Sequence, residues 1–466
     1  MQKFILFVFT FLSFFNSYSQ EITGQWNGLL KVQGTQLRLV FNISKTATGY
    51  TSTMDSPDQG AKDIPTSSTS YENSVLTIKI DNAKIEYIGT VGKDNTIIGN
   101  FSQAGQTFPM NLSHDEIEII KAKRPQNPIE PYPYYSEEVT FKNKKAGVTL
   151  SGTLTLPKKE GIYPVVILIS GSGPQNRDEE LMSHKPFLVL SDYLTRNGIG
   201  VLRYDDRGTA SSTGDFKTAT TQDFATDVQA AVAFLMTKKG VNKKKIGLIG
   251  HSEGGIIAPM VAAKSKNVAF IVLLAGTGIP GDELLLLQQE LIGRASGESE
   301  ENLILGKKEN TELFEIIKKS TDLDQLKKDL SIHMLASLKE NPDSGKPEGV
   351  SDAEYVEYTV EQIATPWMVN FIKYNPANIL EKVKCPVLAI NGSKDLQVPS
   401  KENLTAIHAA LIKGGNQKVT IKELDLLNHL FQECETGSPS EYSEIEQTFS
   451  PVALGLVLNW INEQVK

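Results

Sequence analysis

The sequence has little cysteine, no excess of positive charge and no apolar run long enough to cross a bilayer. Cys385 and Cys434 are the only cysteines in 466 residues, which excludes a disulfide framework and leaves one bridge or two free thiols as alternatives. The net charge of −8 argues against binding to nucleic acid or to an anionic membrane surface. The length is sufficient for two or three domains of ordinary soluble composition.

Motifs that bind cofactors are also missing. The sequence has no C-x-x-C, no H-E-x-x-H and no Asp-rich calcium loop, and neither a Walker loop nor a G-x-G-x-x-G fingerprint follows an apolar run. We therefore predict neither a metal nor a nucleotide cofactor. Histidine is scarce as well, with six in the chain, which narrows the choice of a general base.

The N-terminus has the composition of an export signal. Lys3 precedes an apolar block at residues 4–15, and the small residues Ser17 and Ser19 occupy the −3 and −1 places of a cleavage site. We predict a signal peptide over residues 1–19 and a periplasmic or extracellular protein without stable membrane insertion. An uncleaved anchor is the alternative.

Three regions follow this segment. Residues 20–114 contain short alternating strands separated by turn residues, which predicts a small all-β accessory domain. Residues 115–135 carry four prolines and predict an extended linker. Residues 136–466 alternate apolar strands with amphipathic helices, which predicts a doubly wound, mostly parallel α/β sheet. Helical runs at about residues 283–376 interrupt this order and predict a helical cap over the active site, with a kink or break at Pro366.

The clearest chemical signal is the segment Gly250-His251-Ser252-Glu253-Gly254, which follows an apolar run and precedes a helical one. G-x-S-x-G between a strand and a helix is typical of a nucleophile elbow, where glycines let the two elements approach closely. Ser252 is therefore the predicted nucleophile. The N–H of Glu253, at the start of the helix, is a predicted oxyanion donor. An ordinary Gly-rich turn is the alternative.

A serine nucleophile needs a general base and an acid that orients it. His429 lies just past the last predicted strand, on the side of the sheet where the nucleophile emerges, and is the predicted base. Asp395 directly follows an apolar strand and is the predicted acid, with Asp282 as the alternative. The other histidines are less suited to this role. His114 falls in the β domain, His251 in the elbow itself and His184 ahead of an early helix. His333 falls in the cap, and His408 lies within a helix.

A second oxyanion donor is expected from the loop that follows the apolar strand at residues 165–169. This loop, Ser170-Gly171-Ser172-Gly173-Pro174, has small side chains, so its N–H groups can approach a substrate oxygen. The N–H of Ser172 is the predicted donor, with that of Gly173 as the next candidate. Several large side chains of the predicted cap could line an acyl pocket or form the core of the cap: Trp367, Met368 and Phe371, together with Tyr355 and Tyr358.

These segments together resemble the α/β-hydrolase superfamily and, more narrowly, its EstD-type carboxylesterases, which are bacterial serine esterases with a helical cap. The resemblance spans residues 136–466 and implies Ser252 as nucleophile, Asp395 as acid, His429 as base, and Ser172 and Glu253 as oxyanion donors. One departure is Ala210, where relatives usually carry glycine. The segments that carry the resemblance are 170–174 with Arg177-Asp178, 204–208, 250–255, and 391–395 with Val398-Pro399.

The predicted activity is hydrolysis of a small-molecule carboxylic ester through an acyl-serine intermediate. A serine peptidase of the prolyl or aminopeptidase type is the first alternative, although the β domain is too short for a peptidase propeller and no acidic cluster is evident for a free amine. A non-catalytic binding protein is the second alternative, and the complete set of triad residues argues against it. Ser252 excludes the aspartate nucleophile of epoxide hydrolases and haloalkane dehalogenases.

Overall fold

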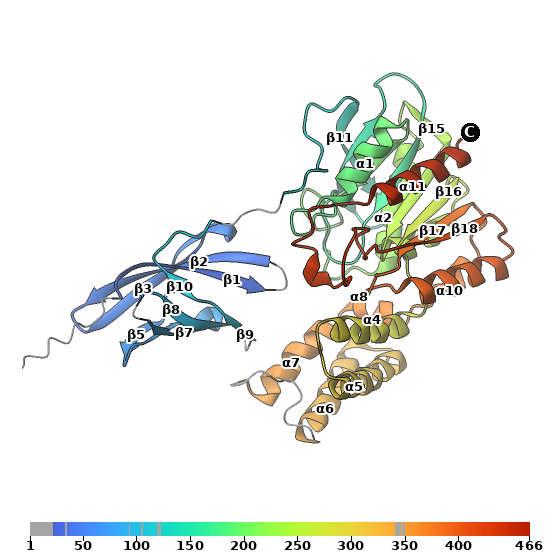
Figure 1. Cartoon of the computed structure of the whole chain (residues 1–466). Coiled ribbons are helices and arrows are strands. Elements are labelled where there is room, and N and C mark those ends of the chain that lie inside the picture. The colour runs from blue at the N-terminus through green and yellow to red at the C-terminus, as the bar shows by residue number, and fades with distance from the viewer. Residues whose placement is uncertain are drawn as a thin grey trace, which may run out of the picture. The chain divides into compact units, whose positions relative to one another are not determined.

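The computed structural model describes residues 22–32, 35–92, 94–103, 106–118, 123–340, 346 and 350–466. The signal peptide predicted at residues 1–19 lies outside the described residues. The chain divides into two compact units, and the boundary between residues 119 and 120 falls inside the predicted linker. Figure 1 shows the strands of the first unit in blue and cyan, and the second unit from green to red.

The first unit is an antiparallel β structure, as the alternating sequence predicts. Its sheet has the order β4-β3-β2-β1-β10-β8-β7-β6-β5, with β9 paired to β8. Ser52 on β3 hydrogen-bonds to Thr69 on β5 at 2.7 Å, so the two ends of the sheet curl toward each other. The strands are β1 (Gly24–Val32), β2 (Thr35–Thr46), β3 (Gly49–Ser56), β4 (Ala61–Pro65), β5 (Ser68–Glu72), β6 (Val75–Ile80), β7 (Ile85–Val91), β8 (Ile97–Gln103), β9 (Gln106–Pro109) and β10 (Leu112–Ser113).

Alternation along these strands builds the core of the first unit. On β6 the side chains of Leu76, Ile78 and Ile80 are buried, whereas Lys79 between them faces solvent, as expected of a strand with one covered face. Trp26 is also buried, and its indole N–H donates to the carbonyl of Ile22 at 2.8 Å. Trp26 is therefore a core residue with a satisfied polar atom.

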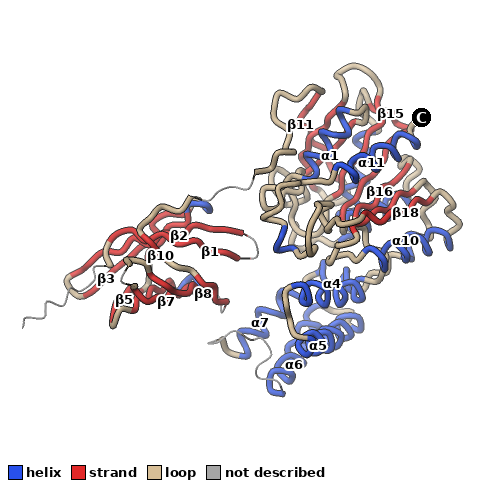
Figure 2. The backbone as a smooth tube through the Cα atoms, viewed as in Figure 1, coloured by secondary structure: helices blue, strands red, loops and turns tan. Residues whose placement is uncertain are grey.

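The second unit contains a mixed eight-stranded sheet (Figure 2) with the order β11-β12-β14-β13-β15-β16-β17-β18. The pairs β11–β12 and β12–β14 are antiparallel, and all pairs from β14 to β18 are parallel. The predicted α/β class is confirmed. The strands are β11 (Tyr135–Asn143), β12 (Val148–Leu156), β13 (Tyr163–Ile169), β14 (Gly200–Tyr204), β15 (Val241–His251), β16 (Phe270–Leu274), β17 (Val387–Gly392) and β18 (Val419–Leu424).

Helices cover both faces of this sheet, which explains the continuous apolar run of β13. Val166 and Leu168 pack with helices α1 (Pro186–Arg196) and α11 (Pro451–Gln464). Val165 and Ile167 face the other way and pack with α2 (Thr221–Leu235), α3 (Gly254–Ala262) and α10 (Ser400–Lys413). The carboxyl ends of β13, β15, β17 and β18 lead into the loops that carry the candidate site residues.

A helical insertion separates β16 from β17, near the position that the sequence predicts. Thr365 caps α8 by accepting a hydrogen bond from the N–H of Met368, and Pro366 occupies the first turn, so the predicted break at Pro366 is confirmed. Among the described residues, no helix combines the length and apolar character needed to cross a membrane. The helices are α4 (Gly281–Ala295), α5 (Glu300–Lys319), α6 (Leu323–Glu340), α7 (Asp352–Ile363), α8 (Pro366–Ile372) and α9 (Ala377–Leu380).

The second half of the predicted linker is held on the second unit. Arg124 donates from its guanidinium to the carbonyls of Met182, Ser443 and Ile445 at 2.7–3.0 Å. The side chain of Gln126 donates to the carbonyl of Phe449 and accepts from its N–H. A guanidinium presents five N–H donors in a fixed fork, so one arginine can fasten several carbonyls at once. The segment from Lys123 onward is thus a strap rather than a free linker.

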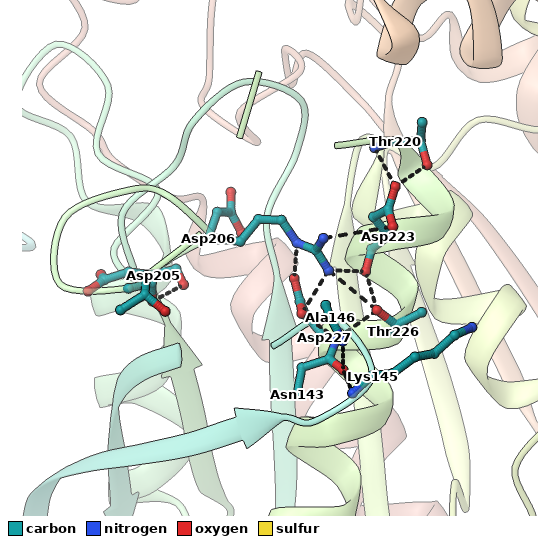
Figure 3. A network of polar contacts seen from close by, with 12 residues as sticks. Asn143, Lys145, Ala146, Asp205, Asp206, Thr220, Asp223, Thr226 and Asp227 are labelled. Atoms are coloured by element: carbon teal, nitrogen blue, oxygen red, sulfur yellow. Dashed lines mark hydrogen bonds and ion pairs between the residues drawn. The ribbon is translucent and has the colours of Figure 1, made fainter. Parts of the chain in front are cut away.

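A buried ion pair joins the loop after β14 to helix α2. The guanidinium of Arg207 donates to both carboxylate oxygens of Asp227, at 2.7 and 3.0 Å, and both residues are less than a tenth exposed. Figure 3 shows Asp227 with Asn143 and Thr226, and the amide of Asn143 donates to the same carboxylate at 2.8 Å. The end of β11, the loop after β14 and α2 therefore meet at one carboxylate.

Removal of Arg207 should destabilise the second unit strongly. In the Arg207→Ala variant the Asp227 carboxylate stays buried without its cation, and such a loss costs about 3–5 kcal/mol of unfolding free energy. The shift in the midpoint of urea unfolding measures it. Arg294→Ala is the control, because Arg294 belongs to a solvent-exposed ion pair with Glu300, and its removal should leave the midpoint unchanged. Equal shifts in both variants would contradict the structural role of the buried pair.

Candidate active site

Ser252 occupies a sharp turn between β15 and α3. Its φ of 52° lies in the left-handed region, which is strained for a residue with a Cβ. The flanking glycines are required for steric reasons: a Cβ on Gly250 would lie 2.0 Å from the carbonyl oxygen of Gly254, and a Cβ on Gly254 would lie 2.2 Å from that of Ile169. The geometry is that of a nucleophile elbow, with the Ser252 side chain partly exposed.

Asp395 and His429 meet at the carboxyl ends of β17 and β18. The Nδ1 atom of His429 lies 2.8 Å from Oδ2 of Asp395, and both residues are buried. The other carboxylate oxygen, Oδ1, accepts the backbone N–H groups of Gln397 and Val398 at 2.8 Å each. These bonds fix the orientation of the carboxylate, which in turn fixes the imidazole.

The elbow and the loop that carries His429 are in direct contact. His251, which immediately precedes Ser252, has Nε2 at 3.0 Å from the carbonyl oxygen of His429, and the centroids of the two imidazole rings lie 4.8 Å apart. Within the described chain no hydrogen bond joins the Ser252 hydroxyl to the His429 ring. Such bonds are often long without substrate and tighten in the reacting complex. The structure therefore places His429 on Asp395 and brings the loop that carries His429 against the elbow that carries Ser252.

Backbone N–H groups converge on the elbow from two directions. Glu253 precedes the first turn of α3, where helix N–H groups are free of intrahelical partners. From the other side, Gly171 packs so closely that a Cβ on it would lie 3.2 Å from that of Ser252. The N–H of Gly171 is already bonded to Oε1 of Glu179 at 2.7 Å, whereas the contacts of the described residues leave that of Ser172 unused. Ser172 and Glu253 thus remain the candidate oxyanion donors.

The side chain of Glu253 is buried beneath the elbow. One oxygen, Oε1, accepts from the hydroxyl of Thr221 at 2.6 Å and from the indole N–H of Trp367 at 2.8 Å. Burial raises the pKa of this carboxyl above its usual range, although the two hydrogen bonds act in the opposite direction. Trp367 belongs to α8, so this bond ties the helical insertion to the elbow.

The predicted acyl-pocket residues have different surroundings. Trp367 is partly buried beside the elbow and stacks on Phe371, with ring centroids 5.2 Å apart. Phe371 is buried in the core that covers the sheet, and Met368 packs with the helical insertion. Tyr355 packs there too, and Tyr358 is 66% exposed. Of the five side chains, Trp367 has the clearest link to the elbow.

The alternative acid and the other histidines have separate partners. Asp282 lies in the first turn of α4 and forms an ion pair with Lys318, whose Nζ atom is 2.9 Å from Oδ2 of Asp282. His184 is buried between Thr448 and the carbonyl of Tyr442, and burial lowers its pKa to about 4. Three further histidines lie elsewhere. His114 packs against Trp26, His333 lies opposite Glu312, and His408 is on the exposed side of α10.

Both cysteines are free thiols, which overturns the single-disulfide alternative. Burial raises the pKa of Cys385 to about 11, so its thiol stays protonated at neutral pH. The thiol of Cys434 lies 3.4 Å from the carbonyl of Leu426. Neither cysteine is among the residues that meet at the elbow.

Sequence reasoning missed the acidic residues that support the oxyanion loop. Asp206 is buried and accepts the Ser170 hydroxyl at 2.9 Å, and burial raises the pKa of its carboxyl well above the usual range. Glu179 is buried on the other side of the loop with a φ of 51°. Irregular loop residues follow no periodicity, so the only available signal was position: Asp206 lies inside the motif at 204–208, and Glu179 directly follows the motif that ends at Asp178. Ala210, the departure from the family pattern, also has a positive φ, 46°, which explains why glycine suits that position.

Comparison with known proteins assigns the chain to a family. Residues 146–424 match the family described as X-Pro dipeptidyl-peptidase (S15 family). The chain is 26% identical over 380 residues to Esterase EstD of Thermotoga maritima, a match that covers 80% of this chain and 75% of the relative. It is also 31% identical over 136 residues to an uncharacterised protein of Pseudomonas aeruginosa, which covers 29% of this chain and 35% of that protein.

The chain also aligns with solved structures at lower identity. An esterase of Pyrococcus furiosus aligns with 75% of this chain and 100% of its own, at 15% identity and a TM-score of 0.44. The family match spans β12 to β18, which is more than half of the chain and includes Ser252 and Asp395. The chain therefore belongs to the X-Pro dipeptidyl-peptidase (S15) family of hydrolases with the α/β-hydrolase fold.

Proposed function

We propose that the protein is a serine hydrolase that cleaves carboxylic esters through an acyl-serine intermediate. The observation that carries the proposal is the 2.8 Å contact between His429 and Asp395, together with the contact of the His429 backbone with the elbow, where Ser252 has a φ of 52°. The likeness to Esterase EstD, which covers four fifths of the chain, favours an ester as the substrate class.

The proposed reaction begins with attack of the Ser252 hydroxyl on the ester carbonyl. His429 takes the hydroxyl proton at Nε2, and Asp395, which accepts from Nδ1, stabilises the imidazolium that forms. The N–H groups of Ser172 and Glu253 bind the oxyanion of the tetrahedral intermediate. His429 then returns the proton to the departing alcohol, and water, activated by the same base, releases the acid and restores Ser252.

The helical insertion is proposed to act as a cap over this site. Its helix α8 reaches the elbow through the Trp367–Glu253 hydrogen bond of 2.8 Å, and Trp367 is the side chain that we propose to contact the acyl group. Because Glu253 directly follows the nucleophile, a displacement of α8 would act on a residue that supplies an oxyanion donor.

An X-Pro peptidase is the second candidate, because the family description names that activity. A dipeptidyl-peptidase must recognise the free amine of its substrate, and a carboxylate is the natural partner for that cation. The carboxylates nearest the oxyanion loop are each buried and already accept hydrogen bonds from the protein: Glu179, Asp206 and Glu253. This arrangement favours the ester.

A substrate panel separates the two candidates. The purified protein should hydrolyse p-nitrophenyl esters in the series from acetate to decanoate, with little turnover of glycyl-prolyl p-nitroanilide. N-acetylglycyl-prolyl p-nitroanilide is the matched control, since it lacks only the free amine. Rapid cleavage of the free-amine anilide that acetylation abolishes would overturn the ester proposal and establish the peptidase.

A further inference from the structure

A buried histidine–glutamate pair lies beside the proposed triad and is not part of it. Nδ1 of His251 lies 2.9 Å from Oε1 of Glu179, and both side chains are less than a tenth exposed. The other ring nitrogen, Nε2, lies 3.0 Å from the carbonyl oxygen of His429. The same Oε1 atom of Glu179 accepts the N–H of Gly171 at 2.7 Å.

These contacts favour a charged form of His251. The carbonyl of His429 can only accept, so Nε2 of His251 must carry a proton. Glu179 is an acceptor toward Gly171, and an ionised carboxylate also accepts from Nδ1. An acceptor at each ring nitrogen favours the imidazolium form of His251, in which both nitrogens donate. Burial opposes this charge, but Glu179 and the His429 carbonyl outweigh it and raise the pKa of His251 above its ordinary value.

Each contact ends at, or one residue away from, a group of the proposed mechanism. Gly171 precedes the oxyanion donor Ser172, and His251 precedes the nucleophile Ser252. His429, the proposed base, accepts the hydrogen bond of His251 at its own backbone carbonyl. We propose that Glu179 and His251 are positioning residues that hold the oxyanion loop, the elbow and the base loop in register, an inference that rests on the proposed function. Such preorganisation acts on the reacting geometry, because a misplacement of about 1 Å can cost about a hundredfold in rate.

The surroundings of His251 contain few other titratable groups. His429 contributes its ring at 4.8 Å between centroids, and the negative charge of Asp395 also favours the His251 cation. The other side chains that line the small void at the ring come from the start of α1, the end of β16, the loop after β18 and the residues before α11, and they are apolar: Pro186, Phe187, Leu274, Leu430, Phe431 and Phe449. The charge of His251 therefore depends chiefly on Glu179.

Glu179→Gln tests the charge while preserving the shape. The amide oxygen can still accept from Gly171, but burial is no longer opposed by a carboxylate, so the pKa of His251 falls and the ring becomes neutral. A neutral ring has one N–H and cannot serve both Gln at position 179 and the His429 carbonyl. We expect kcat for a p-nitrophenyl ester to fall about 10- to 100-fold, with KM changed less than about threefold.

The pH dependence provides a readout that a merely structural role would not give. Below the lowered pKa of His251 the imidazolium forms again and both bonds return. The ratio of kcat in Glu179→Gln to kcat in the wild type should therefore rise as the pH falls from about 8 to about 6, the range in which histidine titrates. In His251→Gln the side chain cannot titrate, so kcat should fall similarly but the ratio should stay flat.

Glu180→Gln is the matched control, because Glu180 is the exposed neighbour that pairs with Lys185 at 3.6 Å, and its kcat should equal that of the wild type. The rate of Ser252 labelling by a fluorophosphonate probe is measured in parallel, since it reports nucleophile activation for any acyl substrate. Normal kcat and labelling in folded Glu179→Gln, or a pH-independent ratio, would overturn the inference. A wild type that labels but leaves esters intact would overturn the ester proposal alone, and the labelling rates would still test the pair.

Discussion

Ser252→Ala is expected to lower kcat for ester hydrolysis about 10⁵- to 10⁶-fold, as loss of the nucleophile does in serine hydrolases that work through a triad. The alanine has no hydroxyl to attack the carbonyl, and His429 then has no proton to accept. The structure places no second hydroxyl in the elbow, where Gly250 and Gly254 flank position 252. Initial rates on a p-nitrophenyl ester, normalised to folded protein, measure the loss.

Ser296→Ala is the control for this substitution, because Ser296 is exposed at the end of α4 and its variant should keep the wild-type rate.

Ser252→Gly separates the loss of catalysis from the backbone strain at position 252. It should be as inactive as the alanine variant but more stable than it, by up to about 1 kcal/mol, because glycine accepts φ 52° without a Cβ penalty. Substantial activity in Ser252→Ala would move the nucleophile elsewhere, and a glycine variant less stable than the alanine variant would contradict the strain.

The elbow and its sheet could be predicted because their signals are local. The glycines at 250 and 254 are required by contacts within a few residues of the turn and with the neighbouring strand β13. The apolar run of β13 reflects burial on both faces, and Pro366, which lacks a backbone N–H, favours the first turn of a new helix at its position. Asp395 and His429 could be placed because parallel strands end at the same edge of the sheet, so residues just after β17 and β18 come together.

The support around the site could not be predicted, because it depends on contacts between distant segments without a periodic pattern. Glu179 and His251 are 72 residues apart, and Arg124 binds a carbonyl 321 residues away. The prolines at 125–133 predict an extended linker, whereas the structure has a turn at residues 125–126 and bends after it, and the prolines do not tell a free segment from a strapped one. Only the guanidinium bonds of Arg124 distinguish the two. Likewise, Trp367 and Phe371 are four residues apart, so the sequence predicts the same face of a helix for both. In the structure Phe371 is part of the core, whereas Trp367 reaches Glu253.

Asp395→Asn is expected to lower kcat about ten-thousand-fold, through the tautomer of His429 rather than through its position. The Oδ1 atom of Asp395 accepts from the N–H groups of Gln397 and Val398, at 2.8 Å each. In the variant those two donors hold the amide oxygen on their side, so the amide NH₂ faces Nδ1 of His429. Nδ1 must then accept, the ring proton moves to Nε2, and Nε2 can no longer take the proton of Ser252.

Asp282→Asn is the matched control for this substitution, since Asp282 is the other acid that the chain order allows. In the structure it pairs with Lys318 at 2.9 Å on the helical insertion, so its variant should keep kcat within about twofold, as expected for loss of an exposed ion pair. Measured kcat and KM on one p-nitrophenyl ester decide between the two aspartates. Because asparagine preserves the size of the side chain and both backbone hydrogen bonds, the Asp395 variant should unfold at a similar temperature. A large loss of kcat in Asp282→Asn, or less than a tenfold loss in a folded Asp395→Asn, would assign the orienting acid elsewhere.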